Sequence, residues 1–148
     1  MTEPWHAANG RFARGYNCAQ SVLSAFSERY GISCEDALRV ASPFGAGMGR
    51  RGEICGVLSG ALMVLGLEYG GERPEAKEEV YRLTREFLDQ FEKRYGSVHC
   101  RDLLGCDIST AEGLQAARDN NVFAAVCPAL VDETTRALAR HLEERPAT

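Results

Sequence analysis

The spacing of apolar residues predicts helices along almost the whole chain. After Asn17, a favoured helix-capping residue, apolar side chains recur at three- and four-residue spacing as far as Tyr30, and Gly31 follows as a stop signal. A capping pattern in residues 33–36 predicts a short helix through Val40. No stretch alternates apolar and polar residues convincingly enough to predict a strand.

The stretch from about Glu53 to Leu67 is apolar almost all round. This pattern is typical of a helix that is buried on every side. Gly56 and Gly60 lie on one face of it, so we expect another backbone to approach closely there. The sequence therefore predicts that this helix is the centre of the fold.

Three further helices complete the expected fold. Pro74 precedes an amphipathic stretch that Gly96 ends, residues 109–112 resemble a capping box before a weaker helix, and Pro128 is expected to start the last amphipathic helix. We found no linker and no internal repeat. We therefore predict an all-α fold: a single-domain helical bundle over residues 1–148, with about five main helices around a buried central one.

Composition and charge narrow the classes of function. Apolar residues make up 45% of the chain and mean hydropathy is −0.26, as in a globular protein. The net charge of −4 argues against a nucleic-acid partner, which would need a basic face. The absence of a long apolar run and of a signal-like start predicts no membrane insertion and a cytoplasmic location. Bundles of this size often pair, which makes a homodimer a candidate assembly.

Six cysteines carry the candidate chemistry. No two are three residues apart, which excludes the spacings of zinc ribbons, thioredoxin-like motifs and c-type haem attachment, so we expect no haem. In a reducing compartment, structural disulfides are rare. These cysteines are then metal or cluster ligands, redox thiols or packing residues: Cys18, Cys34, Cys55, Cys100, Cys106 and Cys127.

Four of the cysteines fall at expected helix starts. Cys18, Cys55 and Cys100 are placed in first turns, and Cys127 directly precedes Pro128. The N–H groups and the dipole of a helix start stabilise a thiolate, which is the form that attacks disulfides and binds metals. Nearby basic residues strengthen three of these sites: Arg14, Arg50, Arg51, His99 and Arg101.

The other two cysteines are weaker candidates. Acidic residues directly follow Cys34 and oppose its ionisation, so we expect a passive role there. Cys106 lies six residues after Cys100, close enough to serve as a resolving thiol. Each cysteine taken alone could also be an inert, buried packing residue.

The segments around these cysteines resemble the C_GCAxxG_C_C family of redox-active proteins. The likeness runs from about Trp5 to Leu142 and rests on residues 17–22, 44–49, 55–62, 100–107 and 127–128, with Val57 where the family usually has alanine. It implies that Cys18, Cys55, Cys100 and Cys127 are the family's recurrent cysteines. The family is similar to the non-haem, iron–sulfur-associated domain of split-Soret cytochromes, which implies a [2Fe–2S] cluster as a candidate cofactor.

Three functions remain open at this point. The first is an iron–sulfur site, or a metal site with zinc as the alternative metal, that passes electrons to an unknown redox partner protein. Four glycines would let the backbone approach this site closely: Gly47, Gly49, Gly52 and Gly56. The second is a metal-free thiol–disulfide oxidoreductase in which Cys55 attacks, next to Arg50 and Arg51. The third is an interaction module with inert cysteines. The loop with the two arginines is also a candidate anion site.

Overall fold

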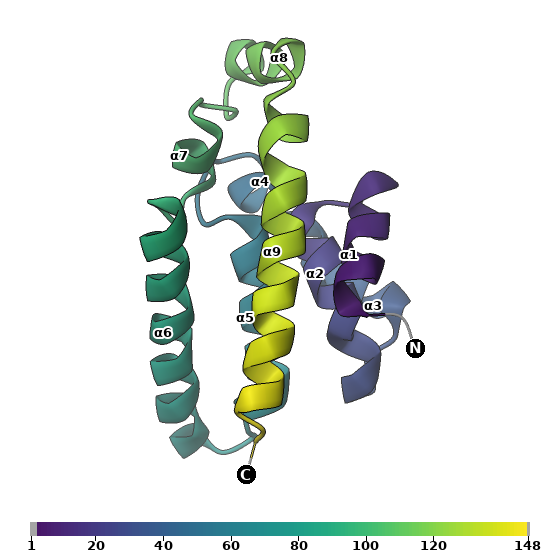
Figure 1. Ribbon diagram of the computed structural model, residues 1–148, viewed down its shortest axis with the longest axis vertical. Coiled ribbons are helices and arrows are strands. Elements are labelled where there is room, and N and C mark those ends of the chain that lie inside the picture. The colour runs from purple at the N-terminus through teal and green to yellow at the C-terminus, as the bar shows by residue number, and fades with distance from the viewer. Residues whose placement is uncertain (1–2, 148) are drawn as a thin grey trace.

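The computed structural model describes residues 3–147 and is built from helices (Figure 1). Within these residues no strand forms, and a single isolated antiparallel bridge joins Ile54 to His99. The all-α prediction is therefore confirmed. In chain order the α-helices and the 3-10 helices (η) are α1 (Pro4–Ala13), α2 (Cys18–Phe26), η1 (Ser27–Tyr30), α3 (Cys34–Ala41), η2 (Ser42–Phe44), α4 (Gly45–Met48), α5 (Gly56–Tyr69), η3 (Pro74–Ala76), α6 (Lys77–Tyr95), α7 (Cys100–Leu104), α8 (Ala111–Asp119) and α9 (Val122–Glu144).

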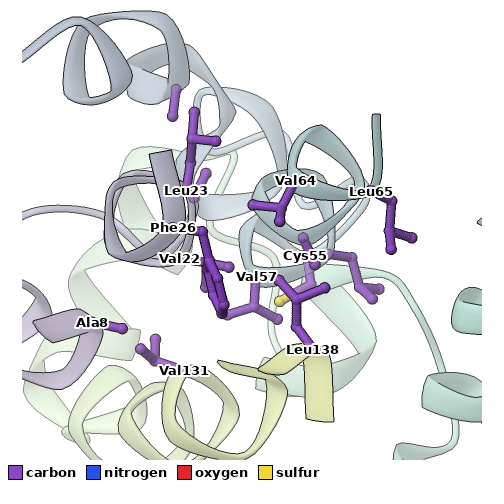
Figure 2. Close-up of a cluster of buried hydrophobic side chains, with 14 of the residues drawn as sticks. Ala8, Val22, Leu23, Phe26, Cys55, Val57, Val64, Leu65, Val131 and Leu138 are labelled. Atoms are coloured by element: carbon purple, nitrogen blue, oxygen red, sulfur yellow. The ribbon is translucent and has the colours of Figure 1, made fainter. Parts of the chain in front are cut away.

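Helix α5 lies at the centre of the bundle, as its apolar sequence predicts. It packs against α2, α6 and α9, and Figure 1 shows it behind α9, between α6 and the α1–α3 group. The side chains of Val57, Leu58, Val64 and Leu65 are almost fully excluded from solvent. Figure 2 shows several of them in one cluster with residues of α2 and α9.

The two glycines near the start of α5 let α2 approach closely. A Cβ atom on Gly60 would lie only 2.8 Å from the carbonyl oxygen of Ala19, and one on Gly56 would overlap the sulfur of Cys18. A side chain at either position would therefore push α2 away. The close backbone approach expected at this glycine pair is present.

The capping residues read from the sequence fix the ends of several helices. Asn17 accepts a hydrogen bond from the Gln20 backbone N–H at 2.8 Å, and the Gln20 side chain accepts one from the Asn17 N–H, which makes a complete capping box. Ser33 caps α3 in a similar way. Gly31 and Gly96 follow their helices with left-handed backbone.

The last helix does not start where the sequence predicted. Helix α9 begins at Val122, so Pro128 lies inside it and Cys127 is not a capping residue. An internal proline removes one backbone hydrogen bond. Here Val122, Phe123 and Val126 pack against the buried Ile108 and its neighbours, and this burial offsets the loss.

Three smaller differences concern helix starts. Helix α1, with Pro4 in its first turn, was not identified from the sequence. Helix α5 begins at Gly56, three residues later than expected, so Cys55 is its capping residue rather than part of its first turn. The cap of α8 is Thr110, because Ser109 instead donates its hydroxyl and N–H to the carboxylate of Asp107.

None of the helices described within residues 3–147 combines the length and the apolar character that crossing a bilayer would require.

Truncating a side chain in the centre of α5 should destabilise the fold strongly. Leu58 is fully buried, so Leu58→Ala should lower the free energy of unfolding by about 2–5 kcal/mol through lost burial and a residual cavity. Val40→Ala is the control, because that side chain is 59% exposed and its loss should change stability by about 0.5 kcal/mol or less. Urea unfolding of both variants measures the difference; equal stability of the two would contradict the central position of α5.

Candidate functional site

Four cysteines from four separate segments line one cavity of about 310 Å³. Cys18 is the first residue of α2, Cys55 caps α5, Cys100 is the first residue of α7, and Cys127 lies in the second turn of α9. Cys55 and Cys100 are buried, whereas Cys18 and Cys127 are half-buried. All six cysteines of the chain are free thiols in this structure.

Backbone hydrogen bonds tie the start of α5 to the start of α7. The Cys55 N–H donates to the Val98 carbonyl at 2.9 Å, and the Cys100 N–H donates to the Glu53 carbonyl at 2.7 Å, on either side of the isolated bridge. These bonds fix the backbone positions of two of the four cysteines. The pairing joins segments far apart in the sequence, so spacing alone did not predict it.

The start of α2 is held against the same point by Gly56. The Cys18 sulfur occupies the space that a side chain at Gly56 would fill, and the Phe44 carbonyl closes the other side. Cys55 belongs to the main buried cluster, and Figure 2 shows its sulfur among that cluster's side chains. The two cysteines are therefore neighbours, close enough for each thiol to shift the pKa of the other.

Residues 46–50 form a run of left-handed backbone beside the cysteines. The φ angles are +54° at Ala46, +66° at Gly47, +68° at Met48, +60° at Gly49 and +71° at Arg50. Each non-glycine residue in this conformation costs roughly 1–2 kcal/mol, so the surrounding structure must hold the run in place. Ala46 and Arg50 both line the cavity.

The glycines singled out from the sequence have different roles in this region. A Cβ on Gly47 would lie 2.8 Å from the Cβ of Cys100 and even closer to backbone atoms, and one on Gly52 would lie 3.0 Å from the Cβ of Arg101. Gly49 has no atom within 4 Å of its Cβ position, so only its left-handed backbone calls for glycine. Of the four, Gly47 and Gly56 are therefore the ones packed directly against cysteines.

Cys18 is the thiol most readily ionised. Its pKa is lowered to about 7, from 9.0 for an ordinary cysteine, first by a hydrogen bond from the Cys55 thiol. Backbone N–H groups of Ala46, Ala19 and Cys18 itself also lower the pKa, while burial opposes them. These N–H groups belong to the helix start and to the left-handed run, so both features stabilise the thiolate.

The other three thiols of the cavity stay protonated at neutral pH. The pKa of Cys55 is raised well above its usual value, because its proton is held in the hydrogen bond to Cys18 and because the thiol is buried. Burial, followed by the charge of Cys18, raises the pKa of Cys100 and of Cys127 to about 12. The charge on Cys18 thus acts on every other cysteine of the cavity.

The structure reverses one expectation about reactivity. The sequence favoured Cys55 as the attacking thiolate because Arg50 and Arg51 precede it, but Cys55 holds its proton and Cys18 is the ionisable partner. The helix-start argument also fails for Cys127, which lies within α9. Basic residues close in the sequence therefore predicted the ionisation of a thiol poorly. Backbone N–H groups brought to the sulfur by tertiary packing have the larger influence.

Two cysteines lie outside the cavity lining. Cys34 is the first residue of α3, and Cys106 follows α7 in a loop packed against the smaller buried cluster that contains Cys100. Cys106 is near enough to Cys100 to raise the pKa of that thiol.

The cavity is also lined by Tyr16, Arg118 and Phe123. Sequence analysis did not single out these residues, because no local motif marks them.

The cysteines do not form a metal site as they are placed. Among residues 3–147, no group of three or more His, Cys, Asp or Glu side chains is arranged so that it could hold a metal ion. A single tetrahedral metal ion would need at least three of these sulfurs around one point, and the described residues present no such group.

Comparisons with known proteins agree with the cysteine pattern. Residues 16–141 match the sequence model of a family described as "Putative redox-active protein (C_GCAxxG_C_C)". No curated protein and no solved structure matches the chain. The resemblance drawn from the sequence is confirmed, and the matched range includes all six cysteines.

The reactivity of Cys18 should rise with pH around a midpoint near 7. Only the thiolate is alkylated, and a pKa of about 7 leaves roughly half of Cys18 ionised at pH 7, against about 1% of an ordinary thiol. Cys55→Ala removes the main hydrogen-bond donor and should shift the midpoint upward, whereas Cys55→Ser keeps a donor and should shift it less. Iodoacetamide labelling followed by mass spectrometry measures each cysteine; a midpoint near 9 in the unsubstituted protein would contradict this electrostatic account.

A methyl group at Gly56 should disturb Cys18 selectively. Gly56→Ala places a Cβ on the Cys18 sulfur, so we expect the thiol to move and its alkylation profile to shift. Gly66→Ala is the matched control in the same helix, because no atom lies within 4 Å of its Cβ position. The same alkylation of Cys18 in both variants would show that the close approach does not govern its reactivity.

Proposed function

The chain belongs to the C_GCAxxG_C_C family of redox-active proteins, and from this premise we propose that Cys18 and Cys55 form a redox dithiol. The proposal makes the protein a thiol–disulfide oxidoreductase or a relay of electron pairs, with Cys18 as the attacking thiolate and Cys55 as the resolving thiol. One observation carries it: Cys18 and Cys55 line the same cavity, and the Cys18 sulfur lies against Gly56, the residue directly after Cys55. The pKa of Cys18 is lowered there, first by its contact with Cys55.

A thiolate beside a protonated thiol suits disulfide exchange. A thiol with a pKa near the ambient pH combines a large ionised fraction with good nucleophilicity. The second thiol must stay protonated until it is needed, and the burial of Cys55 supports that state. In this proposal Cys18 is the attacking thiolate and Cys55 is the thiol held in reserve to resolve the mixed disulfide.

The reaction balances with a small disulfide as the oxidant. The Cys18 thiolate attacks one sulfur of the substrate, the substrate S–S bond breaks, and one thiolate leaves. Cys55 gives its proton to this leaving thiolate and then attacks the Cys18 sulfur of the mixed disulfide. A Cys18–Cys55 disulfide forms and the second substrate sulfur departs as a thiolate, which water protonates; two electrons have moved to the substrate, and an external dithiol restores the pair.

The remaining cavity cysteines have secondary places in this proposal. Cys100 and Cys127 are neutral thiols whose pKa values near 12 keep them from competing as nucleophiles. Cys106 lies close to Cys100 and outside the cavity lining, so it is the candidate for passing oxidation on from Cys100. Cys34 has no part in it.

An iron–sulfur or zinc site is the second candidate. It is favoured by the convergence of Cys18, Cys55, Cys100 and Cys127 on one cavity and by the resemblance to a cluster-associated domain. A single metal ion such as zinc would require three or more of these sulfurs to meet around one centre, and the described residues form no such group as placed. We therefore derive no reaction through a cluster.

Oxidation in a thiol–disulfide buffer tests the dithiol proposal. Protein purified without oxygen should form one principal disulfide, between Cys18 and Cys55, when mass spectrometry follows digestion of samples held at graded redox potentials. Cys18→Ser and Cys55→Ser should each abolish this disulfide, whereas Cys34→Ser should leave its midpoint potential unchanged.

Metal analysis of the same samples separates the alternatives. Stoichiometric iron and sulfide, or zinc, lost in Cys18→Ser would overturn the dithiol proposal in favour of the second candidate. Six unreactive thiols without metal would instead support an interaction module.

A further inference from the structure

The cavity at the cysteines has the dimensions and lining of a small-molecule site. Its volume of about 310 Å³ is at the lower end of the range for ligand pockets, roughly 300–1,000 Å³. Beside the cysteines, its walls are mainly apolar and come from five helices: Phe12, Val57, Leu103, Leu114, Phe123 and Leu130. Such walls favour a ligand with an apolar body.

Two arginines at the surface line the same cavity without a carboxylate partner. Arg50 and Arg118 are both exposed, and neither lies within 4.0 Å of a carboxylate oxygen among residues 3–147. Arg101 nearby, in contrast, pairs with Glu53 at 3.1 Å. Two guanidinium groups that no internal charge neutralises make this opening attractive to an anion.

The backbone around Arg50 is held at a cost. Arg50 has φ of +71°, which an arginine rarely adopts, and it ends the left-handed run that starts at Ala46. Ala46 and Arg50 line the cavity, whereas Met48 between them is 41% exposed. The run thus places the Ala46 N–H group at the Cys18 sulfur and Arg50 at the edge of the cavity.

We propose that this cavity binds a small organic anion, with its acidic headgroup between Arg50 and Arg118 and its apolar body against the walls, beside the Cys18 sulfur. The inference rests on the proposed function only in taking such a molecule as the substrate of the dithiol; binding itself does not depend on it. The substrate class is then an apolar disulfide that carries an acidic group.

Size and charge separate this ligand from other classes. A cavity of about 310 Å³ is too small for a folded partner, and its apolar walls do not suit a strongly polar sugar or nucleotide. A cationic ligand would meet two unpaired guanidinium groups and be repelled. Charge and apolar surface together therefore define the class.

Calorimetry with three probes of equal chain length tests the proposal. Octanoate should bind, 1-octanol should bind several-fold more weakly because it lacks the charge, and octylamine should bind more weakly still. Arg50→Gln and Arg118→Gln should each weaken octanoate binding by about three- to tenfold and leave 1-octanol unchanged. Far-UV circular dichroism verifies that both variants fold.

Arg51→Gln is the matched control. Arg51 is the exposed neighbour of Arg50 but does not line the cavity, so its loss should leave octanoate binding unchanged. Equal affinity for the three probes, no binding of octanoate, or the same loss in Arg51→Gln as in Arg50→Gln would each overturn the proposal. Bound octanoate should also slow alkylation of Cys18, and no slowing at saturation would place the ligand elsewhere.

The outcome is separable from that of the dithiol test. The unsubstituted protein and Arg51→Gln, whose substituted residue lies outside the cavity lining, should both form the Cys18–Cys55 disulfide in a redox buffer without octanoate. Octanoate binding without that disulfide would sink the proposed function alone, and the disulfide without selective octanoate binding would sink the anion site alone.

Discussion

The chemistry of this protein depends on how closely α2 and α5 meet at their starts. With no side chain at Gly56, the Cys18 sulfur can lie against the first turn of α5, where it meets the Cys55 thiol. The central helix is thus both the core of the fold and one wall of the site.

One negative charge organises the four cavity cysteines. In a partly buried site, a second thiolate close to the first would be repelled by it and would lose hydration. The raised pKa values of Cys100 and Cys127 reflect both effects. The contact with Cys55 and the backbone amides around Cys18 lower the pKa of this one sulfur, while burial opposes them.

The sequence predicted the fold better than the site. The apolar stretch around Leu58 and the caps at Asn17 and Ser33 are local signals, and they placed the central helix and its neighbours correctly. The geometry of Cys18 depends instead on Ala46 and Cys55, which reach it only through tertiary packing. The start of α9 was predicted wrongly at Pro128 for the same reason. The residues before Pro128 are helical because they pack against a buried cluster, and a capping rule takes no account of such packing.

The bridge between Ile54 and His99 has a consequence for the order of folding. It closes the loop that contains α5 and α6, and such long-range contacts form slowly because the chain must first give up the entropy of that loop. Of the groups that lower the pKa of Cys18, the Ala46 amide and the Cys55 thiol come from other segments, whereas the amides of Ala19 and Cys18 are local. The full lowering of the Cys18 pKa therefore requires the folded chain, in which Ala46 and Cys55 reach its sulfur.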